Sequence, residues 1–362
     1  MTDIYISKEF HSQVVYGEGF APVRQRLEKE KEVFLVYDRN VEEWTRKLVD
    51  VLEERIPGGD ARPRIQKLAI DASEEGKSME TVLAISRWLL EADASRSAFL
   101  LALGGGITTD LTGFVAATYK RGIRYGNIPT TLLAQVDAAI GGKTGVNLDG
   151  YKNMTGAFHL PEFTYLCADV LCTLPPREFR CGLAEMLKTF LLAEGAAYEE
   201  AVRFFADDRF FAGAQNDRDK LLEFIRKAAG IKAGIVQRDP FESGERAKLN
   251  LGHTFAHAIE HEARLRGDDI SHGEAVGMGM VMAAALSEKL EIAEKGLAAK
   301  LKADFEAVGL PAECPYPAGE LAGAMAKDKK SAGGNVKFVL PVHPGKVILK
   351  NISINDLYLY TK

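Results

Sequence analysis

The chain has 362 residues, of which 46% are hydrophobic and 27% are charged, and its formal net charge is -5. This length and apolar fraction allow two globular domains with buried cores, whereas the negative charge argues against a nucleic-acid-binding surface and favours small-molecule ligands. The N-terminal segment has no basic stretch followed by an apolar one, and no stretch is apolar enough to cross a bilayer, which predicts a cytoplasmic protein without a membrane partner.

Short apolar β-rich runs alternate with helical patterns in the first half of the chain. Strands are predicted over 33–37, 67–70 and 98–103, and helices are predicted around Trp44 and Ile85. Such alternation is typical of β-α units that form a parallel sheet with helices on its faces. We therefore expect an α/β domain over residues 1–176.

Longer helical patterns follow the Leu-Pro-Pro segment that ends at Pro176. They are predicted around residues 184–192, 221–236, 249–263 and 274–290, and a strand pair is predicted at 336–340 and 346–352. Residues 177–362 should therefore form a second, mainly α-helical domain.

Three consecutive glycines, Gly104 to Gly106, follow the apolar strand at 98–103. Glycines at such a strand end let the backbone approach a phosphate, which the next helix N-terminus can hold. The third glycine of the dinucleotide-binding pattern is replaced by Thr109, so a plain tight turn is an alternative. Asp38 and Asn40 end the earlier strand and are suited to ribose hydroxyls, although Asp38 is equally suited to capping a helix.

Histidines recur every four residues at His253, His257 and His261, which places them on one face of a helix. His272 begins the next apolar helix, and Glu185 lies in the segment GLAEMLK. These donors suit zinc with an open coordination position, although the spacing does not decide which histidines bind. His261 is the one most consistent with an ordinary helix residue, and the four cysteines lack the CxxC spacing of a zinc-thiolate site.

Basic residues gather around glycine turns and helix ends although the protein is acidic. As a set they indicate a substrate that carries phosphate and carboxylate groups. They are Lys120, Arg121, Lys143, Lys152, Lys188, Arg246 and residues 327–330.

A series of segments along nearly the whole chain resembles the 3-dehydroquinate synthase family. In order they are GGGITTDLTGFVAATYKRG, IPTTLLAQVDAAIGGKTGVN, YKNMTGAFHLP, TLPPREF, GLAEMLK, RAKLNLGHTFAHAIE, SHGEAVGMGM and KDKK. The resemblance implies a dehydroquinate synthase-like fold, with an NAD-binding α/β domain over 1–176 and a helical metal- and substrate-binding domain over 177–362. It also implies an active site in the cleft between the domains, and a homodimer.

The resemblance further implies a role for each matching residue. Glu185, His253 and His272 are expected to hold zinc or cobalt, which leaves His257 for the substrate phosphate. Catalytic roles are implied for Lys143, Lys188, Arg246, Asn250, His253 and His257. Substrate binding is implied for Asp137, Lys152, Asn153, Lys232, Lys329 and the partner subunit's Arg121, with Lys330 as the alternative to Lys329. NAD binding is implied for Asp38, Asn40, Glu74, Lys77, Gly105, Gly106, Asp110, Thr130, Thr131, Lys143, Lys152 and Thr173.

The family reaction is that of a carbon–oxygen lyase in the shikimate pathway of aromatic amino acid biosynthesis. It converts 3-deoxy-D-arabino-heptulosonate 7-phosphate into 3-dehydroquinate and phosphate. Its steps are transient oxidation by NAD, β-elimination of phosphate, reduction, ring opening and intramolecular aldol closure.

Three other functions compete with this interpretation. A metal-dependent polyol or glycerol dehydrogenase would share the architecture and release NADH, but it has no use for the phosphate-binding set that includes His257. A related sugar-phosphate cyclase, making an inosose or a valiolone, would differ in the carboxylate-binding residues Arg246 and Lys232. A non-catalytic NAD-binding protein would not need the zinc triad.

Overall fold

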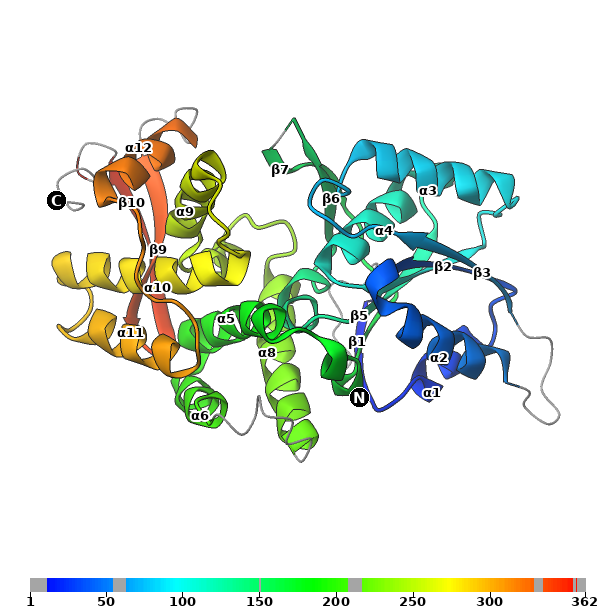
Figure 1. Cartoon of the computed structure of the whole chain (residues 1–362), viewed down its shortest axis with the longest axis horizontal. Helices are drawn as coiled ribbons and strands as arrows, with labels where there is room; N and C mark the ends of the chain where they lie inside the picture. Colours follow the sequence, from blue (N-terminus) through cyan, green and yellow to red (C-terminus); the bar gives the residue numbers. More distant parts are fainter. Residues whose placement is uncertain are drawn as a thin grey trace. The chain divides into compact units, whose positions relative to one another are not determined.

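The computed structural model describes residues 12–54, 63–149, 151–207, 217–328, 335–353 and 356. The chain folds into two compact units (Figure 1). The first comprises Met1–Pro175 and Arg218–Phe241, and the second comprises Pro176–Asp217 and Glu242–Lys362. Among the described helices, none has both the length and the apolar character that a bilayer crossing requires.

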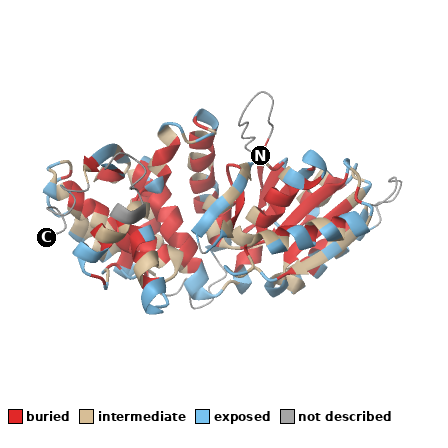
Figure 2. Ribbon diagram, turned by 90° about the horizontal axis from the view of Figure 1, so that it is seen from above, coloured by how far each residue is buried: buried red, intermediate tan, exposed pale blue. Residues whose placement is uncertain are grey.

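A six-stranded sheet of order β1-β8-β5-β4-β2-β3 forms the centre of the first unit, and its neighbouring strands pair in parallel. The strands are β1 (Gln13–Tyr16), β2 (Glu32–Asp38), β3 (Arg64–Ile70), β4 (Phe99–Gly104), β5 (Arg124–Pro129) and β8 (Phe163–Leu166). Every residue of β4 is buried, as expected of a strand covered on both faces. Figure 2 shows the buried character of the sheet.

Helices cover both faces of this sheet. The helices of this unit are α1 (Ala21–Leu27), α2 (Glu42–Glu53), α3 (Met79–Glu91), α4 (Gly106–Thr118) and α8 (Arg218–Arg238). Helices α3 and α4 share one apolar core with Phe34 and Leu100, which lie on the same face of the sheet. Short helical turns are η1 (Arg39–Val41), η2 (Tyr119–Arg121), η3 (Ala134–Ala138) and η4 (Ala168–Thr173), and an antiparallel hairpin is formed by β6 (Lys143–Leu148) and β7 (Tyr151–Phe158).

Helices dominate the second unit, as the sequence predicts. They are α5 (Pro176–Ala193), α6 (Gly195–Phe205), η6 (Glu245–Asn250), α9 (His253–Arg266), α10 (His272–Lys289), α11 (Leu297–Ala307) and α12 (Ala318–Asp328), with an antiparallel pair β9 (Asn335–His343) and β10 (Lys346–Ser353). Helix α10 packs against α5, α9, α11 and β9. It is apolar on all sides because it is the central helix of this unit.

Two predicted boundaries differ from the structure. The helix predicted over 249–263 begins only at His253, because Gly252 adopts a φ of 78° that ends η6 and separates the two helices. The sequence predicts a division into 1–176 and 177–362, whereas in the structure residues 218–241 belong to the first unit. Helix α8 belongs there because it packs against η3 and η4.

Candidate active site

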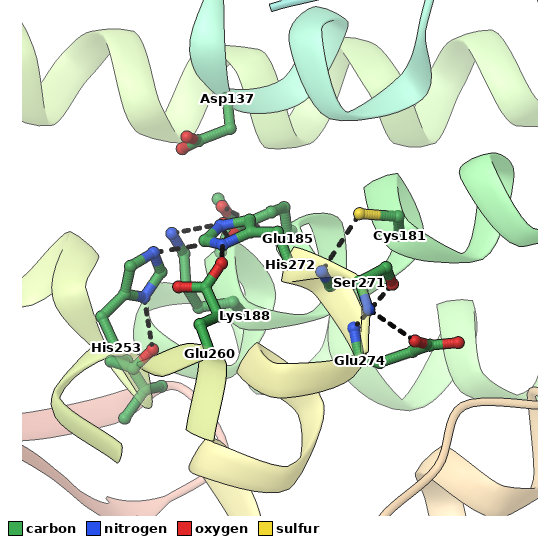
Figure 3. Close-up of polar contacts among 12 residues, drawn as sticks. Asp137, Cys181, Glu185, Lys188, His253, Glu260, Ser271, His272 and Glu274 are labelled. Atoms are coloured by element: carbon green, nitrogen blue, oxygen red, sulfur yellow. Dashed lines mark hydrogen bonds and ion pairs between the residues drawn. The ribbon is translucent and has the colours of Figure 1, made fainter. Parts of the chain in front are cut away.

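Three side chains from separate helices of the second unit converge on one point. Glu185 comes from α5, His253 from the start of α9 and His272 from the start of α10 (Figure 3). One ligand atom of each lies within 4.8 Å of the others. The Nε2 atoms of His253 and His272 lie 3.6 and 3.3 Å from Glu185 Oε1. This set, called the triad below, has the donors and the spacing of a zinc site.

Close helix packing brings the triad together. A Cβ atom at Gly273 would lie only 2.5 Å from the carbonyl oxygen of Cys181, so only glycine lets the start of α10 approach α5 this closely. Ser271 and Glu274 form a capping box that fixes where α10 begins. His272 is therefore held at a helix start that is both capped and packed tightly against α5.

Burial and charge give the triad an unusual electrostatic state. Burial raises the pKa of Glu185, but Lys188, His253 and His272 outweigh this effect and hold it well below the ordinary value. Burial and the nearby Lys188 ammonium lower the pKa of His253 to about 3. Burial also opposes the charge of His272, yet the adjacent Glu185 and Glu260 carboxylates raise its pKa to about 10. Glu185 therefore stays ionised beside one neutral imidazole.

The donor set fits a divalent cation. Glu185 is fully buried, and within the described part of the chain neither of its oxygens accepts a hydrogen bond of good geometry. Lys188 Nζ does form an ion pair with Glu185 Oε2. A buried carboxylate that faces two imidazole nitrogens, without well-aligned donors, is suited to coordinating a metal ion.

Other predicted residues of the second unit lie at different distances from the triad. The ring centroid of His257 lies 5.7 Å from that of His253, whereas His261 Nδ1 lies beside Arg264. Arg246 is buried within η6. Asn250 is exposed and donates from Nδ2 to Glu242 Oε1 at 2.8 Å.

A polar network in the first unit joins several predicted cofactor and substrate residues. Lys77 Nζ donates to Asp110 Oδ2 and to Asn153 Oδ1, each at 2.6 Å. Asn147, which sequence reasoning missed, donates to Glu74 Oε2 at 2.9 Å and accepts from the Asn153 N–H at 3.0 Å. The network links the turn before α3 to the hairpin strand β7.

Burial and charge have opposite effects on the pKa of Asp110 in this network. Burial raises the pKa of Asp110, and the adjacent Lys77 ammonium opposes this rise. Lys152 is half exposed, with Nζ 3.9 Å from Glu74 Oε1. Lys143 is exposed at the start of β6. The exposed lysine ends are therefore accessible to a ligand, while Lys77 is held within the fold.

The turn from β4 into α4 has the backbone features of an anion site. Gly105 is the N-cap of α4, and none of the described side chains caps this helix. The N–H groups of its first turn are thus available to an anion. A Cβ atom at Gly105 would lie 3.1 Å from Thr131 Cγ2, and one at Gly106 would lie 3.1 Å from Ala138 Cβ, so larger residues would crowd the turn. Thr130 donates its N–H to the carbonyl of Gly104.

Two predicted cofactor residues make local contacts. Asp38 accepts a hydrogen bond from the N–H of Asn40 at 2.9 Å and caps η1, so the capping interpretation is confirmed. Its role toward a ribose stays a prediction. Thr173 Oγ1 accepts a hydrogen bond from the indole N–H of Trp44 at 3.0 Å.

Two predicted substrate residues contact each other rather than standing apart. Lys232 Nζ, on α8, donates to Asp137 Oδ1 at 2.8 Å and to its backbone carbonyl. Asp137 lies in η3, a π-helical turn, a feature frequent at functional sites. Arg121 is exposed with a φ of 66°, whereas Lys329 and Lys330 lie outside the described residues.

Comparisons with known proteins agree on one family. A family model described as 3-dehydroquinate synthase N-terminal matches residues 67–181, and one described as 3-dehydroquinate synthase C-terminal matches residues 182–331. The chain is 44% identical to a 3-dehydroquinate synthase of Acidithiobacillus ferrooxidans over 274 residues, 75% of this chain and 73% of that protein. It is 41% identical to that of Pyrococcus abyssi over 309 residues, 85% and 86% of the two chains.

A solved structure extends the similarity to the fold. The 2-epi-5-epi-valiolone synthase of Streptomyces hygroscopicus subsp. jinggangensis, with NAD+ and Zn2+ bound, matches with a TM-score of 0.85 at 27% sequence identity. The match covers 98% of this chain and 96% of the other. The predicted fold class, a parallel α/β part followed by a helical part, is confirmed.

Proposed function

Because the chain belongs to the 3-dehydroquinate synthase family, as its sequence motifs predict, we propose that it converts 3-deoxy-D-arabino-heptulosonate 7-phosphate into 3-dehydroquinate and phosphate. We further propose NAD and a divalent ion, zinc or cobalt, as cofactors. The observation that carries this proposal is the triad, in which Glu185, His253 and His272 meet beside a buried lysine.

The metal would be held by the triad and the dinucleotide by the first unit. When bound, NAD+ accepts a hydride and the metal ion acts as a Lewis acid toward substrate oxygens. Gly105 and Gly106 would let the backbone approach the pyrophosphate at the start of α4. Asp38, Asn40, Glu74, Lys77, Asp110, Thr130, Thr131 and Thr173 are the other residues proposed to bind the dinucleotide.

Cationic side chains would bind and orient the substrate. Lys152 and Asn153 both lie on β7, and their ammonium and amide groups would each bind a phosphate or hydroxyl oxygen of the substrate. Lys143, at the start of the paired strand, would add a second ammonium. Their charges stabilise the leaving phosphate, whose own oxygens can accept the proton released during elimination.

Residues of the second unit are also proposed to bind the substrate. His257 is exposed on the same helix as His253 and would donate to the phosphate, while Arg246 would pair with the carboxylate. Lys188 is buried against Glu185, so it would keep that carboxylate ionised and donate to a neighbouring substrate oxygen. Asn250 would hold a proton-relaying water.

Several assignments are proposed on the family resemblance alone. Lys232 and Asp137 are proposed to reorient toward substrate from the hydrogen-bonded pair that they form. The partner subunit's Arg121 is proposed to reach the phosphate in a homodimer. Lys329 is proposed as a further phosphate contact, and a cytoplasmic location stays a prediction.

An assay that follows two products together tests the proposed reaction. The purified protein receives the phosphorylated substrate with a catalytic amount of NAD+, and inorganic phosphate and NADH are recorded. Phosphate release without accumulation of NADH is the expected result. Conversion of the added NAD+ into NADH without release of phosphate would instead identify a dehydrogenase. A ketose phosphate that lacks the carboxylate, given as a control substrate, should react poorly, and its preferential turnover would identify a different sugar-phosphate cyclase.

Matched histidine variants test the metal assignment on one helix. His253→Ala should lose both metal and phosphate release, because it removes a proposed ligand. His261→Ala changes the same residue type on the same helix and should keep both. His257→Ala should keep the metal while weakening turnover of the phosphorylated substrate. Retention of metal and activity by His253→Ala would overturn the assignment.

A further inference from the structure

The two triad histidines are held in different ways. His253 Nδ1 lies 3.1 Å from the backbone carbonyl of Leu251, whereas His272 Nδ1 lies 3.3 Å from Glu260 Oε1 (Figure 3). In both residues the other ring nitrogen, Nε2, faces Glu185. One ring is therefore oriented by the main chain and the other by a carboxylate from a neighbouring helix.

A hydrogen bond at one ring nitrogen fixes what the other can do. When Nδ1 carries the proton and donates it to an acceptor, Nε2 keeps the lone pair that a metal ion requires. The Leu251 carbonyl lies two residues from His253 and is fixed by the turn into α9. The acceptor for His272 is the side chain of Glu260, so a substitution can remove it.

Glu260 is placed for this role by helix periodicity. It lies seven residues after His253 on α9, and residues spaced by seven lie on the same helix face. Its side chain is only 14% exposed, and it spans the contact between α9 and α10. A carboxylate this deeply buried needs polar partners, and the imidazole of His272 is one of them.

We propose that Glu260 is a positioning residue that holds the His272 ring so that Nε2 points at the metal ion beside Glu185, and that it thereby sets the metal affinity. The inference rests on the proposed function because it requires the triad to bind a metal. Glu260 is not one of the three ligand residues of the triad. Its loss should weaken metal binding without removing any ligand.

Metal affinity of the full-length protein tests the role directly. Metal-free protein is titrated with Co2+ and with Zn2+ in competition with a chromophoric chelator. Glu260→Ala should weaken binding by about 10- to 100-fold, the range found when such outer partners are removed. Glu260→Gln should retain most of the affinity, because its amide oxygen still accepts the Nδ1 proton. The visible absorption of bound Co2+ should change in Glu260→Ala, since the His272 ring is then free to turn.

The chain offers a matched control on the same helix. Glu262 is 15% exposed and lies 3.8 Å from Arg266, so Glu262→Ala removes a carboxylate of equal burial that does not reach His272. It should leave metal affinity and the Co2+ spectrum unchanged. If Glu260 had only a structural role, Glu260→Ala would lower the stability of the metal-free protein, measured by urea unfolding, but would change neither the metal affinity nor the Co2+ spectrum.

Two outcomes would overturn the inference. One is wild-type metal affinity in Glu260→Ala, and the other is a loss no larger than that of Glu262→Ala. If Glu260→Ala does not fold, Glu260→Asp, whose shorter side chain cannot reach His272, replaces it with the same expected weakening. Glu185→Ala separates the two proposals. If this variant still binds metal, the proposed metal site itself is wrong. If Glu185→Ala loses metal binding while Glu260→Ala keeps the wild-type metal affinity, only this inference is rejected.

Discussion

Replacing Gly273 with alanine should damage the triad without touching a ligand. The added Cβ would lie 2.5 Å from the carbonyl oxygen of Cys181 and 2.8 Å from its carbonyl carbon. Nonbonded carbon contacts have their optimum at about 3.5–4.0 Å, so the start of α10 must move by roughly 1 Å away from α5. These are backbone atoms of a buried helix, so they cannot rotate aside. The neighbouring His272 would move with α10, away from Glu185.

The magnitude follows from two opposing effects. Overpacking of this kind costs about 1–3 kcal/mol, and the better helix propensity of alanine returns at most about 1 kcal/mol. We expect Gly273→Ala to lower the free energy of unfolding by about 1–2 kcal/mol. Metal binding should fall further, because metal–ligand distances tolerate shifts of only about 0.2 Å.

A second glycine of the same helix is the control. A Cβ at Gly277 would meet its nearest atom, the carbonyl oxygen of Pro311, at 3.5 Å, which is ordinary contact. Gly277→Ala should therefore stabilise the protein by up to about 1 kcal/mol and keep the metal. Urea unfolding followed by far-ultraviolet circular dichroism and a chelator competition measure the two effects. If Gly273→Ala matches Gly277→Ala in both assays, the packing argument is wrong.

Three further changes probe other features of the fold. Glu185→Gln and Lys188→Met each remove one member of a buried ion pair, so each should lower the free energy of unfolding of the metal-free protein by about 3–5 kcal/mol, measured with urea. The double variant should lose less than the sum of the two single losses, and additive losses would contradict the pairing. An alkylating reagent should modify exposed Cys172 first, and should reach Cys181, whose pKa burial raises to about 12, only after unfolding, as peptide mass spectrometry would reveal. Burial raises the pKa of Tyr198 above its ordinary value of 10.0, so above that pH the unfolded state loses a proton that the folded state keeps. Stability should therefore fall with rising pH by up to about 1.4 kcal/mol per pH unit from this group, and Tyr198→Phe should flatten that slope in urea unfolding between about pH 9 and 11.

The central strands β2 and β4 of the parallel sheet could be predicted because they are nearly continuous apolar runs. The run at 98–103 is recognisable as a strand buried on both faces, and the structure has β4 at Phe99–Gly104. The placement of α8 could not be predicted in the same way. An amphipathic helix shows that one face is buried, but it does not show which unit buries it, and the contact of Lys232 with Asp137 joins residues far apart in the sequence.

The metal ligands could be predicted only in part from spacing. Residues four apart share a helix face, so His253, His257 and His261 were equivalent on that argument, and the family resemblance was needed to choose. The structure brings His253 together with Glu185 and His272 because α9 and α10 approach at glycines. That approach depends on contacts between helices, which the pattern within one helix does not contain.

The charges around the triad connect Glu260, which sequence reasoning did not single out, to the proposed chemistry. Glu185 and Glu260 carry two negative charges and Lys188 carries one positive charge, so these three side chains leave a deficit of one. A proton on His272 balances that deficit in the metal-free protein, consistent with the raised pKa of this residue. A divalent ion that replaces this proton would instead leave an excess of one positive charge, in a buried setting where charge interactions are strong. An anionic substrate oxygen would then be attracted to the ion, and the second carboxylate, Glu260, would keep that excess from becoming larger.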